Sequence, residues 1–165
     1  MIRPATPADI PSVKDLERAC ATAAHWTEQQ YCQMFQVPPG DPQRLVLVTV
    51  GMPEVPLQPD RDAGSDAGTS VRGFLVARHL APDWELENIV VAATARRIGL
   101  GKRLLDALFA AARETNSDSV FLEVRESNMA ARALYEETGF EPTARRKAYY
   151  ADPVEDAILY CKTLN

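Results

Sequence analysis

The sequence predicts an α/β fold in which helices cover the faces of a central β-sheet. Two observations carry this prediction. Segments with apolar residues three and four positions apart alternate with short strand-like segments, an order typical of a layered α/β domain. The chain has 165 residues, of which 46% are hydrophobic, and this is enough to bury one core of ordinary size. We therefore expect one domain over residues 1–165.

The first half of the chain is expected to hold four strands and two helices. "MIRPAT" is typical of a short strand, and Pro7 then opens a helix whose apolar residues keep the helical spacing to about Cys20. Thr27 and Gln30 have the spacing of a capping box, which predicts a second helix that ends near Phe35. Further strands are expected at residues 44–50, 71–80 and 84–91.

Residues 51–70 connect two of these strands and are rich in Pro, Asp, Gly and Ser. The segment has few large apolar residues to anchor it, and it is longer than a hairpin needs. Because neither half of the chain looks complete alone, we expect a mobile loop within one domain.

The second half is expected to add two helices and three strands. A helix from Gly99 to about Asn116 carries leucines and alanines on one stripe. Asn128 has the character of a helix cap, and Gly139 stands where that helix should end. The strands are expected at residues 119–124, 144–150 and 156–164, so that the sheet has about seven strands and about four helices around it.

Composition excludes several classes of function. The net charge of −5 does not suit a general nucleic-acid-binding protein, which would carry excess basic residues. Cys20, Cys32 and Cys161 lack metal-binding spacing, and their odd number favours reduced thiols in the cytoplasm. His25 and His79 have no ligand partners near them in sequence, so we expect no metal. The N-terminus has no signal-peptide character and no apolar run reaches membrane-spanning length, so no membrane association is expected.

The stretch "ARRIGLGKRLL", from Ala95 to Leu105, places two glycines and four basic side chains at the start of a predicted helix. A P-loop would need glycine at Arg96 and Ser or Thr at Arg103, and a dinucleotide fingerprint would need glycine at Leu104. The pattern left is Arg-x-x-Gly-x-Gly before a helix, where unpaired backbone N–H groups face an anion. It suits a diphosphate, and the alternative is an ordinary turn before a solvated basic helix.

Two side chains in the following segments are candidates for acid–base chemistry. Glu123 lies in mid-strand on the same face as Phe121 and Arg125. In a covered sheet such a carboxylate is either paired with a cation such as Arg125 or kept for chemistry. Tyr135 shares one helix face with Asn128. It either packs in the core or faces a ligand, because Asn128 makes that face partly polar.

Three stretches resemble the GNAT superfamily of acetyl-coenzyme A-dependent N-acetyltransferases: "NIVVAATARRIGLGKRLL", "FLEVRESNMAARALYEETGF" and "RRKAYYADPVEDAIL". They are most similar to the RimI family, whose members acetylate the N-terminal alanine of a small-subunit ribosomal protein. "HWTEQQY" resembles the early helix of that family, so the resemblance covers nearly the whole chain. It implies a mixed, mostly antiparallel, twisted sheet that splays at its middle.

The resemblance also implies a role for individual residues. Glu123 matches the general base, and Tyr135 the general acid towards the departing thiolate. On the acceptor side we expect Trp26, Glu85, Glu87, Tyr149 and Tyr150. The implied acetyl-coenzyme A side comprises Val90, Val91, Arg96, Arg97, Ile98, Gly99, Leu100, Gly101, Lys102, Arg103, Asn128 and Tyr135. The implied acceptor is the N-terminal peptide of a protein, a ribosomal protein in that family, and the expected state is a monomer or weak homodimer.

Two alternatives stay open at this point. Glu87 stands where relatives usually carry an apolar residue, and Glu85 lies two residues away on the same strand face. This acidic pair would suit a GNAT enzyme that acetylates a small cationic amine, such as a polyamine or an aminoglycoside. The other alternative is an acyl-coenzyme A-binding module without catalysis, and the presence of both Glu123 and Tyr135 counts against it.

Overall fold

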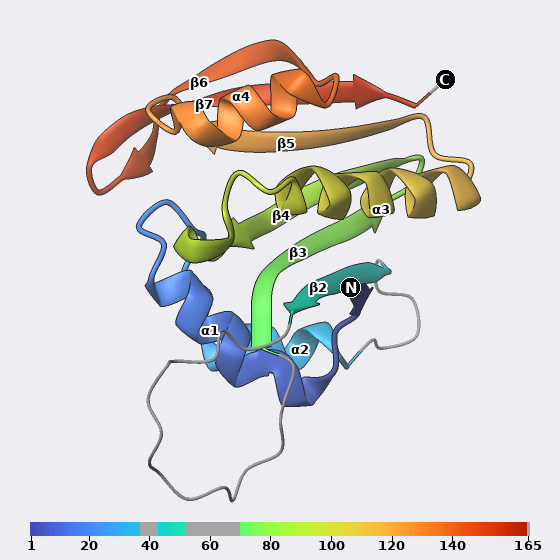
Figure 1. The fold of residues 1–165 in the computed structure, drawn as a ribbon. Coiled ribbons are helices and arrows are strands. Elements are labelled where there is room, and N and C mark those ends of the chain that lie inside the picture. The colour runs from blue at the N-terminus through green and yellow to red at the C-terminus, as the bar shows by residue number, and fades with distance from the viewer. Residues whose placement is uncertain (37–42, 52–69, 165) are drawn as a thin grey trace, which may run out of the picture.

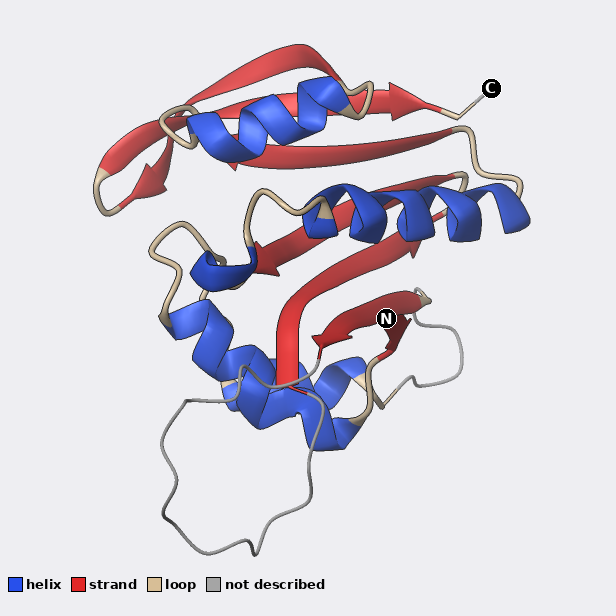
Figure 2. Ribbon diagram, in the orientation of Figure 1, coloured by secondary structure: helices blue, strands red, loops and turns tan. Residues whose placement is uncertain are grey.

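The computed structural model describes residues 1–36, 43–51 and 70–164, which form one sheet with helices on its faces (Figures 1 and 2). Along the chain the elements are β1 (Ile2–Pro4), the 3-10 helix η1 (Pro7–Asp9), α1 (Ile10–Arg18), α2 (Glu28–Met34), β2 (Arg44–Gly51), β3 (Ser70–Leu80), β4 (Asp83–Val91), the 3-10 helix η2 (Ala93–Ala95), α3 (Leu100–Glu114), β5 (Ser119–Arg125), α4 (Met129–Glu137), β6 (Glu141–Ala151) and β7 (Val154–Thr163).

The sheet has seven strands in the order β1-β2-β3-β4-β5-β7-β6. Every neighbouring pair is antiparallel except β4 and β5, which run parallel. The structure therefore confirms the mixed, mostly antiparallel sheet. Most boundaries lie within two residues of the sequence prediction, and the largest difference is in β6, which begins at Glu141, three residues before the expected start.

The sheet splays between β4 and β5. These strands pair only through Trp84 with Val120 and Glu85 with Phe121, whereas β5 and β7 pair along the whole of β5. After Glu85, β4 continues to Val91 beside β3 without β5 on its other side. The predicted splay is confirmed, and it divides the sheet into an N-terminal half and a C-terminal half.

Two apolar clusters cover opposite faces of the sheet. One cluster joins α3 and α4 to the sheet and includes the fully buried Leu104, Leu108 and Leu122. The other joins α1 and α2 to β2, β3 and β4 and includes Tyr31 and Phe74. In Figure 1, α4 accordingly lies over β5 and β7, and α3 over β3 and β4. The face of β5 to β7 opposite α4 has no such helix among the described residues, so Phe121 and Glu123 on that face are only partly buried.

Local signals in the sequence account for the helix ends. The Thr27 hydroxyl accepts from the backbone N–H of Gln30 at 3.2 Å, and the Gln30 side chain accepts from the N–H of Thr27 at 2.8 Å. This capping box starts α2 as predicted. Gly139 follows α4 with a φ of 89°, a left-handed conformation that costs glycine little.

The predicted loop 51–70 falls almost wholly on residues 52–69, which lie outside the described part of the chain. Its ends, Gly51 and Ser70, pair with each other as the last and first residues of β2 and β3. Within the described residues, none of the helices has the length and apolarity to cross a membrane.

A buried carboxylate stabilises the start of α1. Arg3 donates from both terminal nitrogens to the two carboxylate oxygens of Asp9, each at 2.8 Å, and the backbone and hydroxyl of Thr6 also donate to Asp9. The hydrogen bonds from Arg3 are the largest cause of the lowered pKa of Asp9, which falls to about 2.

We expect Asp9→Asn to lower the free energy of unfolding by about 1–2 kcal/mol at pH 7, after allowing for solvent screening. Because the folded pKa lies below the unfolded value, this stabilisation is complete above about pH 5 and disappears as the pH falls towards 2. Urea unfolding of both proteins across this pH range checks the prediction. A difference that stays constant down to pH 2.5 would contradict it.

Candidate functional site

The turn before α3 leaves backbone N–H groups open at the helix end. Gly99 caps α3 with a φ of 78°, and Arg97 also has a positive φ, of 62°. The Arg103 N–H donates to the Gly99 carbonyl at 3.0 Å, so the N–H groups of Leu100 and Gly101 precede the first helical bond. A Cβ added to Gly99 would meet no atom within 4 Å. Free donors, an open approach and the positive helix end make this turn a suitable anion site.

The two glycines of the turn have different roles. A Cβ on Gly101 would lie 2.9 Å from Leu134 Cδ2 in α4, so Gly101 allows α3 and α4 to approach closely, whereas Gly99 faces open space. Arg96 turns back to the sheet, and its Nε donates to the Val91 carbonyl at 3.3 Å. The exposed residues of the predicted coenzyme set around the turn are Arg96, Arg97, Ile98, Gly99, Lys102 and Arg103.

Val90 and Val91 form the end of β4 beyond the splay. They pair on one side with Phe74 and Gly73 of β3. Gly73 permits this close approach, since a Cβ there would lie 2.9 Å from the Val90 carbonyl oxygen. The ladder with β5 has ended by this point, so β4 presents an edge with which an extended chain can pair.

Glu123 lies on β5 and is paired with Arg146 of β6, at 3.1 Å between Oε1 and Nη2. Arg125, the cation that the sequence suggested for Glu123, does not form this ion pair; it contacts Glu155 at 3.3 Å. The Arg146 guanidinium lies 5.3 Å from the Tyr149 ring centre, and hydrogen bonding to Glu123 is the main cause of a raised pKa of Tyr149. Arg146 and Tyr149 of β6 thus hold Glu123 in place.

Tyr135 lies in α4 with its ring in the core, against Phe140 and Tyr160. Burial, and to a smaller extent the nearby Tyr150, raises the pKa of Tyr135. Tyr150 has a raised pKa too, through burial and then through the charge of Glu123. Tyr150 therefore lies close enough to interact electrostatically with both Tyr135 and Glu123. Because its pKa is raised, Tyr135 stays protonated at neutral pH.

Glu85 and Glu87 are neutralised by arginines from neighbouring strands. Arg78 of β3 contacts Glu85 at 2.7 Å and Glu87 at 3.6 Å, and Arg44 of β2 contacts Glu87 at 3.1 Å. The charge of Glu85 also makes a small contribution to the raised pKa of Tyr149, so Glu85 of β4 lies near Tyr149 of β6. The predicted acidic pair is present, but it carries no excess negative charge.

Asn128 and Trp26 occupy structural positions beside the site. The Asn128 side-chain oxygen accepts from the Ala131 N–H at 3.2 Å, which confirms Asn128 as the cap of α4 and leaves its amide nitrogen for other contacts. Trp26 is half-buried in the connection between α1 and α2, with its ring centre 5.7 Å from that of Tyr31. The α1–α2 connection and the β6–β7 turn project towards the same side of the molecule in Figure 1.

Sequence reasoning missed three arginines that complete this site: Arg44, Arg78 and Arg146. Each pairs with a carboxylate on a different strand, and the pairing depends on strand order and register. The only sequence signal was that each is a basic residue within a predicted strand.

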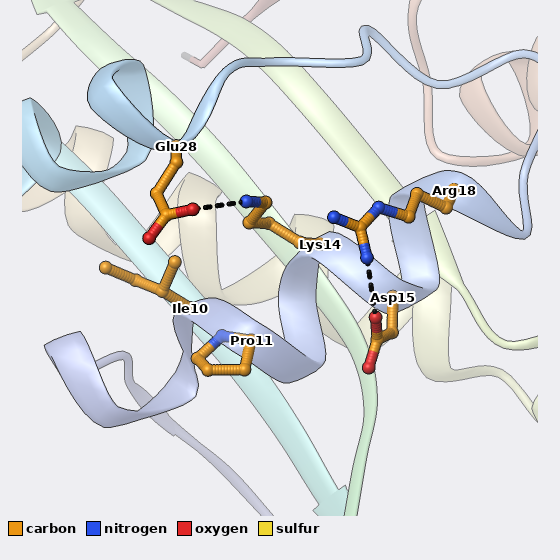
Figure 3. A pocket seen from close by; sticks show the side chains of 6 residues that line it. All are labelled: Ile10, Pro11, Lys14, Asp15, Arg18 and Glu28. Carbon is orange, nitrogen blue, oxygen red and sulfur yellow. Dashed lines mark hydrogen bonds and ion pairs between the residues drawn. The ribbon is translucent and has the colours of Figure 1, made fainter.

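A small hollow on α1 and α2 is separate from this set of residues (Figure 3). Its charged side chains are already paired, Lys14 with Glu28 at 2.8 Å and Arg18 with Asp15 at 3.2 Å. We assign no ligand to it.

Comparison with known proteins agrees with this geometry. Residues 61–140 match the model of the acetyltransferase (GNAT) family, a range that includes the turn before α3, Glu123 and Tyr135. The [ribosomal protein bS18]-alanine N-acetyltransferases of Haemophilus influenzae and Escherichia coli are 40% identical over 81 residues and 39% identical over 88 residues. These matches cover 49% and 52% of this chain, and they span only 55% and 60% of the relatives' own length.

A solved structure extends the similarity to the whole fold. The crystal structure of the ribosomal-protein-S18-alanine N-acetyltransferase from Escherichia coli superposes with a TM-score of 0.73 at 25% identity, covering 100% of this chain and 94% of that one. The strand order, the splay and the turn before α3 agree with this superposition: the chain has the GNAT fold, and its residues 61–140 match the acetyltransferase (GNAT) family.

Proposed function

We propose that this protein transfers an acetyl group from acetyl-coenzyme A to the N-terminal α-amino group of a protein, with a ribosomal protein as the leading acceptor. One observation supports this most: where β4 parts from β5, the free edge of β4 leads into the glycine turn of α3, and the facing strand β5 carries Glu123. Tyr150 lies near enough to both Glu123 and Tyr135 for their charges to affect one another. The names of the relatives support the acceptor class.

The residues present fit acetyl-coenzyme A. The open space in front of Gly99 and the basic residues Arg97, Lys102 and Arg103 suit its pyrophosphate. Val90 and Val91 would hold the extended pantetheine arm along the β4 edge, and Asn128 would contact it from α4. When bound, the coenzyme supplies the acetyl thioester.

Two side chains of the protein would then transfer protons, one from the acceptor amine and one to the leaving sulfur. A peptide α-amino group has a pKa near 7.7–8.0, about 2.5 units below that of lysine, so deprotonating it at neutral pH costs about 3.4 kcal/mol less. Glu123 is suited to accept this proton, either directly or through water, once its contact with Arg146 is given up. Tyr135, kept protonated by burial, is suited to donate a proton to the leaving sulfur.

The small-amine alternative loses its main support. It depended on an acidic surface formed by Glu85 and Glu87, and Arg44 and Arg78 neutralise both carboxylates. Release of free coenzyme A, measured with a library of N-terminal peptides beside a panel of polyamines and aminoglycosides, tests the proposed class. Turnover of the small amines alone would overturn it, and binding of acetyl-coenzyme A without turnover of any amine would favour the binding module.

We expect acetyl-coenzyme A to raise the melting temperature of the protein, since it binds only the folded state. Gly99→Asp should abolish this increase, because a carboxylate would enter the open space of the turn. Gly139→Asp is the matched control: it also places Asp at a positive φ, and the first atom it would meet is the end of the flexible Lys162 side chain. An unchanged ligand-induced shift in the Gly99 variant would contradict the assignment.

Glu123→Gln should reduce turnover of an N-terminal peptide by about 10²–10⁴-fold at neutral pH while acetyl-coenzyme A affinity changes little. The deficit should shrink as the pH rises through the pKa of the peptide amine, because the acceptor then arrives neutral. Steady-state rates from pH 6 to 9 measure this. Near-wild-type activity at pH 7 would place the base elsewhere.

Tyr135→Phe keeps the ring packing and removes only the hydroxyl. We expect lower turnover that high pH does not restore, because the missing proton is the one delivered to the thiolate. The ratio of wild-type to variant rates over the same pH range checks this. A deficit that vanishes at high pH would assign Tyr135 to the amine side of the reaction.

A further inference from the structure

A buried carboxylate at the end of α1 joins three elements around the acceptor side. Glu17 is only 3% exposed, and its Oε1 accepts from the backbone N–H of Trp26 at 3.0 Å and from Asn88 Nδ2 at 3.1 Å. The Tyr31 hydroxyl of α2 is buried beside the same carboxylate without a hydrogen bond of good geometry. One side chain thus ties the α1–α2 connection and β4 to α1.

The position of Asn88 makes this connection relevant to the site. The register between β3 and β4 shifts between Val76 and Ala77, which pair with Asn88 and Leu86, so Glu87 is the extra residue of a β-bulge. Asn88 directly follows this bulge and precedes Val90 by two residues. Glu17 therefore anchors the residue that follows the bulge, two positions before the free edge of β4.

We infer that Glu17 is a positioning residue for acceptor binding, which holds Trp26 and the bulge of β4 in one geometry. The effect expected on peptide KM rests on the proposed function. The effect expected on the position of Trp26 rests on the Glu17 hydrogen bonds alone. Without Glu17, the Trp26 N–H and the Asn88 amide both lose their buried acceptor. The α1–α2 connection around Trp26 then becomes more mobile, while the turn before α3 is unaffected.

The kinetic test compares three variants. Glu17→Ala should raise KM for an alanine-starting peptide on the order of tenfold without changing acetyl-coenzyme A affinity, since displaced positioning groups weaken productive binding. Glu17→Gln keeps an oxygen acceptor and should restore KM to within about twofold of wild type. Asp9→Ala is the matched control, because it removes another buried, multiply bonded carboxylate at the opposite end of α1 and should leave KM unchanged.

Tryptophan fluorescence gives a readout that needs no turnover. The chain has two tryptophans, and Trp84 is only 1% exposed, so acrylamide quenching reports chiefly on Trp26. Quenching should increase about twofold in Glu17→Ala, and not in Glu17→Gln or Asp9→Ala. Unchanged quenching in Glu17→Ala, or an equal rise of peptide KM in Asp9→Ala, would overturn the inference. If wild-type protein turns over no peptide, the proposed function fails, and the quenching result alone decides whether Glu17 holds Trp26.

Discussion

The incomplete pairing of β4 with β5 is the constraint on which the site depends. Only Trp84 and Glu85 of β4 form ladder pairs with β5, and the two strands then separate. Among the described residues, no strand pairs with β4 at Val90 and Val91 on the side away from β3. The turn before α3 follows this edge in the chain. The face of β5 that carries Glu123 is open for another reason, since no helix covers it among the described residues. If β4 and β5 were paired along their full length, β5 would bond to the backbone N–H and C=O groups at this edge of β4 and close the site.

The charged groups around the splay are balanced within the protein. Glu85, Glu87 and Glu123 each lie 13–27% exposed and contact an arginine from another strand. Burying a carboxylate without such a partner is costly, so the arginines allow several acidic side chains to share a partly desolvated surface. Under the proposed function this has a consequence for specificity, because a surface without excess charge would select an acceptor through shape and hydrogen bonding more than through net attraction.

The parts of the fold that depend on neighbouring residues in the chain were predicted well. The capping box of Thr27 and Gln30, the glycine cap at Gly99 and the end of α4 at Gly139 all rest on interactions within a few residues. The alternation of buried and exposed residues in β5 was equally readable, since side chains of a strand point to opposite faces. Strand ends were less exact, because β6 begins where its pairing with β7 begins.

By itself, the sequence determined the α/β class, most helix and strand positions, the glycine turn before α3 and the resemblance that singles out Glu123 and Tyr135. Only the tertiary structure decided which charges meet. Arg146, and not the nearby Arg125, pairs with Glu123, and Glu17 reaches Asn88 across 71 positions of sequence. The physical reason is that register and strand order bring such side chains together, and periodicity within one segment carries no information about the segment packed against it.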